Sequence, residues 1–212
     1  MPRLADIRLP AEPSSALQRA KYERMLQAAT ELGAVYDFDH VQMHEVARRA
    51  GVAIATLYRY FPSKTHLFVN VMLSEIAKMS HNLERRNGRL AELGPIESAT
   101  DALIRALRAL HRHPRVASSM IYAANAAHVS RLPGVQRVDN SFEAVLLAST
   151  HVHEPTEHDV VVLRLLQQQW FAIVQSCLSG LVTLQRAEFD VRLACELLLM
   201  PLSSVQRESS VE

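Results

Sequence analysis

The stretch "VQMHEVARRAGVAIATLYRYFPSK", residues 41–64, decides the fold, because its pattern predicts two short amphipathic helices and the turn between them. The first helix, over about 42–50, has apolar residues at i, i+3, i+4 and i+7, the spacing of one helix face. These residues are Met43, Val46, Ala47 and Ala50. Glycine readily takes the left-handed conformation that follows a helix, so Gly51 is expected to end this one.

A second short helix is expected over about 54–60. Pro62 disfavours helical geometry at the residue before it, so the helix must stop there. At 100° per residue, one side of this helix holds Leu57 and Phe61 and the opposite side holds Ala55 and Arg59, with Thr56 and Tyr58 at the edges. Two short helices joined by a glycine turn are typical of a helix-turn-helix. The outer face of the second helix is small near its start and basic near its end.

This outer face suits contact with double-stranded DNA. A small residue lets a helix lie deep in the major groove, and the methyl and hydroxyl groups of Thr56 can meet a base edge. Arg59, Tyr58 and Tyr60 can donate hydrogen bonds to phosphates, and Lys64 stands at the start of the next helix, beside the same DNA backbone. On spacing alone, a plain helical hairpin with a solvated outer face remains an alternative.

The rest of the chain predicts an all-α fold. Apolar residues recur at helical spacing along nearly all 212 residues, and no stretch shows the alternation of a strand. Ser15 and Ser63 are placed to cap helices, and prolines, Pro201 among them, mark the breaks. The expected helices lie near 16–36, 42–50, 54–60, 63–87, 96–111, 115–128, 135–150, 157–185 and 188–204.

Composition narrows the class of protein. The net charge is +1, but residues 1–88 carry 12 Lys and Arg against 9 Asp and Glu, a weak basic bias that suits an anionic partner. Only two cysteines occur, so a reducing compartment such as the cytoplasm is expected. Residues 165–185 contain no charged side chain, but they include five glutamines, which disfavour a membrane span.

Catalytic and metal sites are not indicated. The chain has no Gly-rich phosphate loop, nucleophile elbow or Cys–His signature, so we expect neither enzymatic activity nor a cofactor. His151, His153, Glu154 and His158 cluster in the sequence, but they stand beside Pro155 between expected helices, so we expect no metal site.

Residues 41–68, "VQMHEVARRAGVAIATLYRYFPSKTHLF", resemble the DNA-binding domain of the TetR family of bacterial transcriptional regulators. The matching positions are Val46-Ala47, Ala50-Gly51-Val52, Thr56-Leu57-Tyr58, Tyr60-Phe61 and Ser63-Lys64. Two positions depart from the common pattern, since Val41 replaces a frequent threonine and Ala53-Ile54 replaces a frequent Ser-Lys. The resemblance implies DNA contacts from Gln42, His44, Ile54, Ala55, Thr56, Tyr58, Tyr60 and Lys64, to which the helix wheel adds Arg59.

The same residues also resemble the KstR branch of this family, the actinobacterial repressors of steroid catabolism. "EPTEHDVVVLRLLQQQW", residues 154–170, resembles that branch more loosely. This resemblance implies a steroid or its coenzyme A thioester as effector. The alternatives are a regulator of another lipid, fatty acyl-CoA or efflux regulon, and a DNA-binding protein that no ligand regulates.

The two last expected helices predict a dimer. Both are apolar on all sides, so they must be covered on all sides, and a second subunit is the simplest cover. In the TetR family these two helices form a four-helix interface. The residues expected in the interface are Leu166, Ile173, Leu181, Leu193, Leu197 and Met200. A central core helix in a monomer is the alternative.

The middle helices combine methionines and aromatic residues with a few polar groups, a composition that suits an adaptable apolar cavity. Ordinary core is the alternative for each position. The candidate ligand contacts are Met72, Ile76, Met79, Met120, Tyr122, Asn125, Phe142, Gln169 and Trp170.

The sequence therefore predicts a homodimeric repressor that binds a palindromic DNA operator and is released by an apolar small molecule. The expected parts are a disordered tail (1–15), a helix-turn-helix domain (16–62), a connecting helix (63–87) and a ligand-binding and dimerisation domain (88–212).

Overall fold

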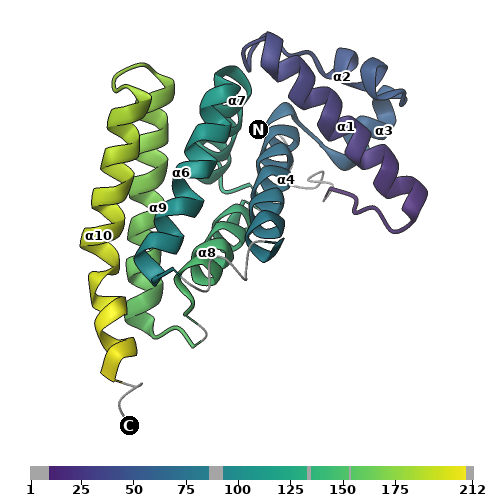
Figure 1. The fold of residues 1–212 in the computed structure, drawn as a ribbon. Helices are drawn as coiled ribbons and strands as arrows, with labels where there is room; N and C mark the ends of the chain where they lie inside the picture. The colour runs from purple at the N-terminus through teal and green to yellow at the C-terminus, as the bar shows by residue number, and fades with distance from the viewer. Residues whose placement is uncertain (1–9, 86–92, 133–134, 153, 209–212) are drawn as a thin grey trace. The chain divides into compact units, whose positions relative to one another are not determined.

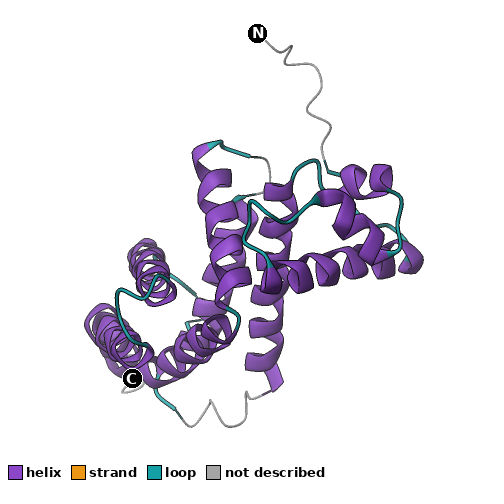
Figure 2. Ribbon diagram, turned by 90° about the horizontal axis from the view of Figure 1, so that it is seen from above, coloured by secondary structure: helices purple, strands orange, loops and turns teal. Residues whose placement is uncertain are grey.

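The computed structural model describes residues 10–85, 93–132, 135–152 and 154–208, the stretch 201–208 by its backbone alone. Within these ranges every regular element is a helix, joined by turns and short irregular segments, and no strand occurs, as the sequence predicts (Figures 1 and 2). The helices are α1 (Ala16–Val35), α2 (Met43–Ala50), α3 (Ile54–Tyr60), α4 (Lys64–Arg85), α6 (Pro95–Arg112), α7 (Pro114–Val129), α8 (Gln136–Thr150), α9 (Glu157–Leu178) and α10 (Leu184–Glu208).

The expected helix starts are confirmed by their caps. The Ser15 hydroxyl accepts a hydrogen bond from the backbone N–H of Gln18, and the Ser63 hydroxyl accepts one from the N–H of His66. These bonds satisfy donors that a helix leaves unpaired in its first turn.

The expected break after α9 lies earlier than the sequence indicates. The helix ends at Leu178 instead of near 185, and α10 already begins at Leu184. Gly180 lies between them with φ +77°, a conformation that glycine adopts without strain. The break expected at Pro201 is absent, because α10 continues to Glu208. A proline removes one helical hydrogen bond, but the residues after it can still continue the helix.

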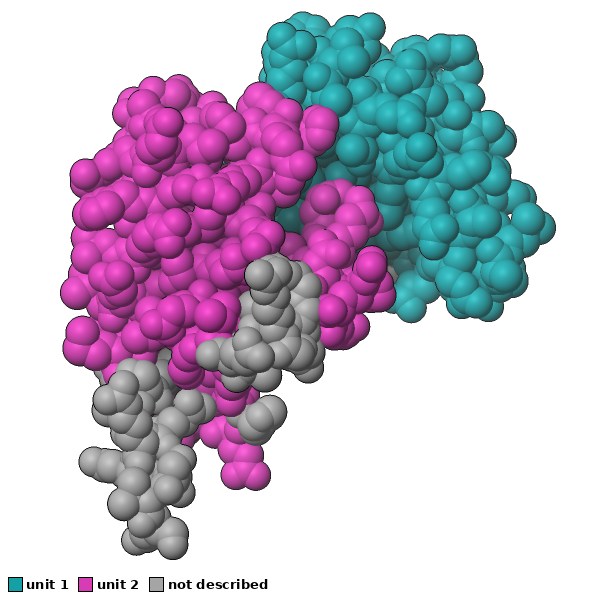
Figure 3. Space-filling view, in the orientation of Figure 1, with its two compact units in different colours: residues 1–73, 115–138 teal, residues 74–114, 139–212 magenta. Residues whose placement is uncertain are grey.

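The chain forms two compact units, shown in different colours in Figure 3. Unit 1 consists of Met1–Leu73 and Arg115–Val138, and unit 2 consists of Ser74–Pro114 and Asp139–Glu212. Each unit therefore combines two separate stretches of chain, and α4 contributes its first half to unit 1 and its second half to unit 2.

The core of unit 1 depends on a close approach at Gly33 of α1. A Cβ atom at this position would lie 3.0 Å from Cε1 of Phe68 on α4 and 3.2 Å from Cγ2 of Val116 on α7. Phe68 is fully buried and Val116 nearly so. The glycine thus lets α1, α4 and α7 pack without a gap, which fixes the support under the two short helices.

In unit 2, α6, α9 and α10 pack along one another (Figure 1). Arg108 of α6 makes a bidentate pair with Glu188 of α10, at 2.6 and 2.7 Å. The indole Nε1 of Trp170 on α9 donates to the backbone carbonyl of Leu103 on α6, at 3.2 Å. The Trp170 ring also lies 4.9 Å from that of Phe142, which brings α8 against α9.

Candidate functional site

The turn between α2 and α3 has the geometry that its sequence predicts. Gly51 has φ +65°, and its N–H donates to the carbonyl of Arg48 at 3.2 Å. The N–H of Val52 donates to the carbonyl of Ala47 at 3.0 Å. These two bonds close the end of α2 and send the chain directly into α3.

The inner face of α3 is anchored in the core of unit 1. Leu57 and Phe61 are fully buried. The Tyr22 ring of α1 lies 4.9 Å from the ring of Phe61 and 5.8 Å from that of Tyr60. The Tyr22 hydroxyl donates to Oδ1 of Asn70 on α4 at 2.7 Å, and burial raises the pKa of Tyr22 to about 12. Aromatic packing therefore holds α3 against α1, and the hydrogen bond ties α1 to α4 beneath it.

The outer face of α3 is exposed. Ile54 and Tyr58 are 41% and 47% exposed, Ala55 and Arg59 are also exposed, and Thr56 is half-buried. The Arg59 guanidinium lies 5.9 Å from the centre of the Tyr60 ring, and no described carboxylate lies within ion-pair distance of it. This leaves a cation at the end of a helix face that is small and polar near its start.

Two of the nine expected DNA-contact residues turn inward. Tyr60 is only 4% exposed, because its ring packs against Tyr22. The Lys64 ammonium donates to the backbone carbonyls of Asp39 at 2.9 Å and Val41 at 3.0 Å, so it ties the start of α4 to the segment before α2. Burial lowers the pKa of Lys64, and nearby Asp39 opposes that change.

At the start of α2, Gln42 and His44 are exposed, which a contact with DNA would require. Gln42 occupies the N-cap position but makes no capping hydrogen bond with its side chain. On the same helix Arg48 makes an ion pair with Glu45, and its hydrogen bond holds the pKa of that carboxyl below its usual value. Gln42 and His44 thus lie exposed at and just after the N-cap of α2.

The candidate ligand residues are divided between the two units. In unit 1, Met72 and Met120 are buried, whereas Tyr122 and Asn125 are exposed. The Tyr122 ring lies 4.7 Å from Phe38.

In unit 2, Phe142 and Trp170 lie together and Ile76 is buried. Met79 and Gln169 line two different grooves.

The first groove, of about 570 Å³, lies between α9 and α10. We call it the α9–α10 groove. Of the candidate interface residues, Ile173, Leu193 and Leu197 line it. Leu181 and Met200 are 80% and 60% exposed outside it, whereas Leu166 is already buried within its own chain.

The second groove, of about 580 Å³, lies between α4 and α6 and is lined by four arginines, Arg85, Arg105, Arg108 and Arg112. We call it the α4–α6 groove. The sequence reasoning missed these residues. Their signal is the spacing of Arg105, Arg108 and Arg112 at i, i+3 and i+7, which places them along one side of α6.

Two further findings concern metal binding and membrane spans. Among the described residues, no group of His, Cys, Asp and Glu side chains is arranged to hold a metal ion. No helix in the described part of the chain has the length and apolar character needed to cross a membrane.

Comparison with known proteins places these features in a family. The model for the tetR family of bacterial regulatory proteins matches residues 25–71, which include α2 and α3. The model for the tetracyclin repressor-like C-terminal domain matches residues 94–198. The two matches together span both compact units.

Individual relatives agree with these matches. The HTH-type transcriptional repressor KstR of Rhodococcus jostii is 31% identical over 88% of this chain and 86% of its own. The crystal structure of a TetR transcriptional regulator from Rhodococcus sp. RHA1 has a TM-score of 0.82 and 46% identity, covering 88% of this chain and all of the other. The fold is also shared by Thermus thermophilus FadR in complex with lauroyl-CoA, at a TM-score of 0.65 and 17% identity over 84% of this chain and 93% of that one. The family match that the residues of α2 and α3 indicate is thus confirmed, and the chain belongs to the TetR family of bacterial regulatory proteins.

Proposed function

We propose that this protein is a dimeric transcriptional repressor that binds a palindromic operator and leaves it when an apolar effector binds. The observation that carries this proposal is the outer face of α3, which is exposed, small near its start and cationic at Arg59, on a helix whose inner face is locked into the core. The relatives named KstR, which are described as transcriptional repressors, support the negative sense of the regulation. A regulator of chromosomal DNA in a bacterium acts in the cytoplasm.

In this proposal α3 enters the major groove. Ala55 lets the helix approach the bases, and Thr56 and Ile54 meet base edges. Tyr58 and Arg59 bind phosphates, and Gln42 and His44 of α2 contact the flanking backbone. The inward direction of Tyr60 and Lys64 gives them a supporting role, because both hold α3 and α4 at the angle that the outer face needs.

Dimerisation would place two such helices over successive major grooves, about 34 Å apart along the DNA. The α9–α10 groove supports this part, because two of its apolar residues, Leu193 and Leu197, are 41% and 63% exposed. Leu181 and Met200 extend the apolar surface beyond the groove. Exposed apolar areas of this kind are common at protein interfaces, and a second copy of the chain would cover them.

The effector class that we propose is an apolar small molecule, with a steroid or its coenzyme A thioester as the first candidate. Another lipid or a fatty acyl-CoA is the alternative, as is regulation without any ligand. The effector must bind the form that cannot span both half-sites more tightly than the form that can, since equal affinity would shift nothing. Recovery of small molecules from protein incubated with cell extract, followed by mass spectrometry, would test this choice. A bound steroid thioester supports the first candidate, and a different lipid or aromatic compound refutes it.

DNA recognition is tested with an operator selected by the protein from random duplexes. We expect Thr56→Ala to weaken operator binding about tenfold with little change for unrelated DNA, because a base contact is lost. Arg59→Gln should weaken both and lower the salt dependence by about one ion per subunit, because a phosphate contact is lost. Ser118→Ala removes an exposed hydroxyl of α7 in the same unit and is the matched control. Unchanged operator affinity in both α3 variants, with dimers intact, would contradict the proposed reading face.

A further inference from the structure

The α4–α6 groove combines a cationic rim with an apolar floor. Its lining carries four arginines and one carboxylate, Asp101, for a formal charge of +3. Between these charges lie Met79 and Leu83 of α4 and the alanines of α6. This combination lies wholly within unit 2, and the DNA-binding face and the α9–α10 groove do not include it.

The floor follows from the sequence of α6. Ala102, Ala106 and Ala109 stand at i, i+4 and i+7, so their small side chains form one stripe along the helix. Leu103 and Leu107, beside this stripe, are fully buried and fix the rotation of the helix. Because alanine fills little space, the stripe leaves a hollow that a larger side chain would close.

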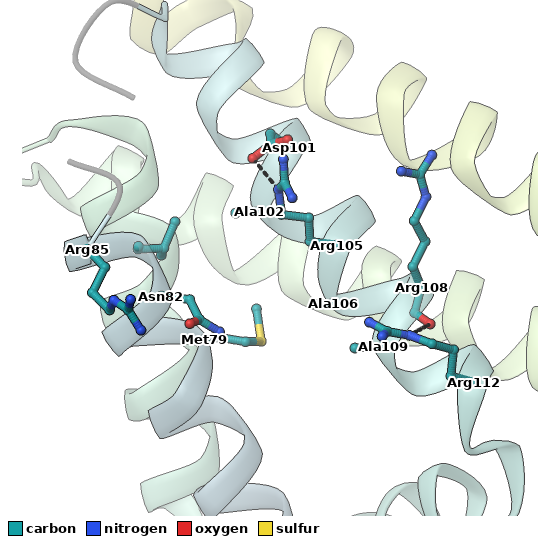
Figure 4. A pocket seen from close by; sticks show the side chains of 11 residues that line it. Met79, Asn82, Arg85, Asp101, Ala102, Arg105, Ala106, Arg108, Ala109 and Arg112 are labelled. Atoms are coloured by element: carbon teal, nitrogen blue, oxygen red, sulfur yellow. Dashed lines mark hydrogen bonds and ion pairs between the residues drawn. The ribbon is translucent and has the colours of Figure 1, made fainter. Parts of the chain in front are cut away.

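The four arginines of the rim differ in whether their guanidinium groups already make an ion pair with a carboxylate. Arg105 makes an ion pair with Asp101 at 2.7 Å, and Arg108 reaches away from the groove to Glu188 on α10 (Figure 4). Arg112 donates only a long bond, of 3.4 Å, to the carbonyl of Arg108. Arg85 on the opposite wall has no carboxylate within ion-pair distance among the residues that the structure describes.

Apart from Arg108, the arginines therefore face the hollow from two helices. Figure 4 shows Asn82 and Arg85 on α4 at one side, and Arg105 and Arg112 on α6 at the other. Guanidinium groups on opposite walls suit an anion with oxygens on several sides, which a phosphate group has and a planar carboxylate lacks. A hollow of about 580 Å³ fits a small molecule and differs from the flat basic row that follows a nucleic acid backbone.

We propose that the α4–α6 groove binds a small phosphate ester, whose phosphate lies among Arg85, Arg105 and Arg112 and whose apolar part lies on the alanine stripe. Two sources share this chemistry: a phosphorylated part of the effector itself, and a separate phosphate-containing metabolite. The site does not depend on the proposed repressor function, because the binding can be measured on the dimer without DNA.

The test uses 1-naphthyl phosphate, which joins one phosphate to a flat apolar ring, in isothermal titration calorimetry with the full chain at low salt. Inorganic phosphate has the charged group without the ring, and 1-naphthol has the ring without the phosphate. We expect saturable binding of 1-naphthyl phosphate at one site per subunit, and binding at least about tenfold weaker for each half. Equal affinity for inorganic phosphate would refute the role of the alanine stripe, and equal affinity for 1-naphthol would refute the role of the arginines.

Variants locate the site. The double variant Arg85→Gln/Arg112→Gln removes the two least engaged cations and should weaken binding at least about tenfold. Ala109→Leu keeps every charge but fills the hollow, and it should fold normally because Ala109 is exposed. It should therefore weaken binding to a similar degree.

The matched control is Arg164→Gln, which removes an exposed arginine of α9 that lines neither groove. It should bind like the parent protein. An equal loss in this control would show diffuse charge attraction and overturn the proposal, as would unchanged binding in Ala109→Leu. Weaker binding of unrelated DNA by the double variant, with no saturable binding of 1-naphthyl phosphate, would assign the arginines to nucleic acid instead. Circular dichroism melting curves verify that each variant is folded.

Discussion

The outer face of α3 and the exposed face of α9 and α10 are both helix surfaces that the isolated chain leaves open, yet they differ in chemistry. The first holds Ala55, Thr56 and Arg59, which are small, polar or charged. The second holds Leu193 and Leu197, which are apolar. Water solvates the first well and the second poorly, so the first suits a transient charged partner and the second a lasting apolar one.

The two faces also differ in how much their helices depend on packing within their own unit. α3 is only seven residues long, too short to be stable alone, so its position depends on the residues beneath it. α9 and α10 have 22 and 25 residues and pack along each other, so an exposed residue between them can change without loss of either helix. Variants of buried and exposed leucines should therefore have opposite consequences in the two regions.

The largest expected effect is at the inner face of α3. Leu57→Ala leaves a cavity in the core of unit 1, because Leu57 is fully buried. We expect the free energy of unfolding to fall by about 3 kcal/mol, measured by urea denaturation followed by circular dichroism. Ile54→Ala, on the exposed side of the same helix, should change it by less than about 0.5 kcal/mol. Equal losses in the two variants would contradict the orientation of α3.

The next effect is at the exposed face of α10. Leu197→Glu places a carboxylate in the α9–α10 groove, where a second subunit would leave it buried and unpaired. Dimerisation should weaken at least about a hundredfold in sedimentation velocity experiments, equivalent to about 2.7 kcal/mol, while the helix content stays unchanged. Val129→Glu alters an apolar residue of α7 that is 86% exposed and should leave the dimer intact. A dimer that survives Leu197→Glu would assign this face to another partner.

A feature of these regions is predictable from the sequence when the residues that determine it lie close together along the chain. The ends of α2 and α3 and the core role of Leu57 follow from neighbours within ten residues, and the structure agrees with them. The helix wheel likewise places Tyr60 beside Leu57 and Phe61, and the structure agrees, because the ring of Tyr22 on α1 packs against it. The DNA contact expected of Tyr60 comes instead from the family resemblance and from its hydroxyl group, and neither takes account of the neighbouring helix that covers the ring.

The same argument explains the misses in unit 2. The end of α9 at Leu178 depends on the turn at Gly180, which the run of apolar residues on both sides conceals. The arginine rim of the α4–α6 groove requires α4 and α6 to lie beside each other, and Arg108 finds its partner Glu188 eighty residues further along the chain. The periodicity of α6 shows which of its residues share one side of the helix, but it does not show which other helix lies against that side.

The smallest expected effect concerns the polar contact that holds α3 in place. The pKa of Tyr22 is raised from about 10 to about 12 because its hydroxyl is largely buried. Above pH 10 the unfolded chain loses the Tyr22 proton while the folded chain keeps it, so stability due to this group is complete below pH 10 and falls as the pH rises toward 12. The ring is only partly buried, so we expect a loss of about 1 kcal/mol between pH 9 and pH 11.5.

Tyr22→Phe cannot ionise, and it should lose less stability over this range than the parent protein in urea denaturation. Because Tyr22 and its contacts Tyr60, Phe61 and Asn70 belong to unit 1, whereas the α9–α10 groove belongs to unit 2, dimerisation should show no difference between the two proteins over the same range. A Tyr22→Phe variant that follows the parent curve would show that this hydroxyl ionises as readily in the folded unit as in the unfolded chain, and α3 would then be held by apolar packing alone.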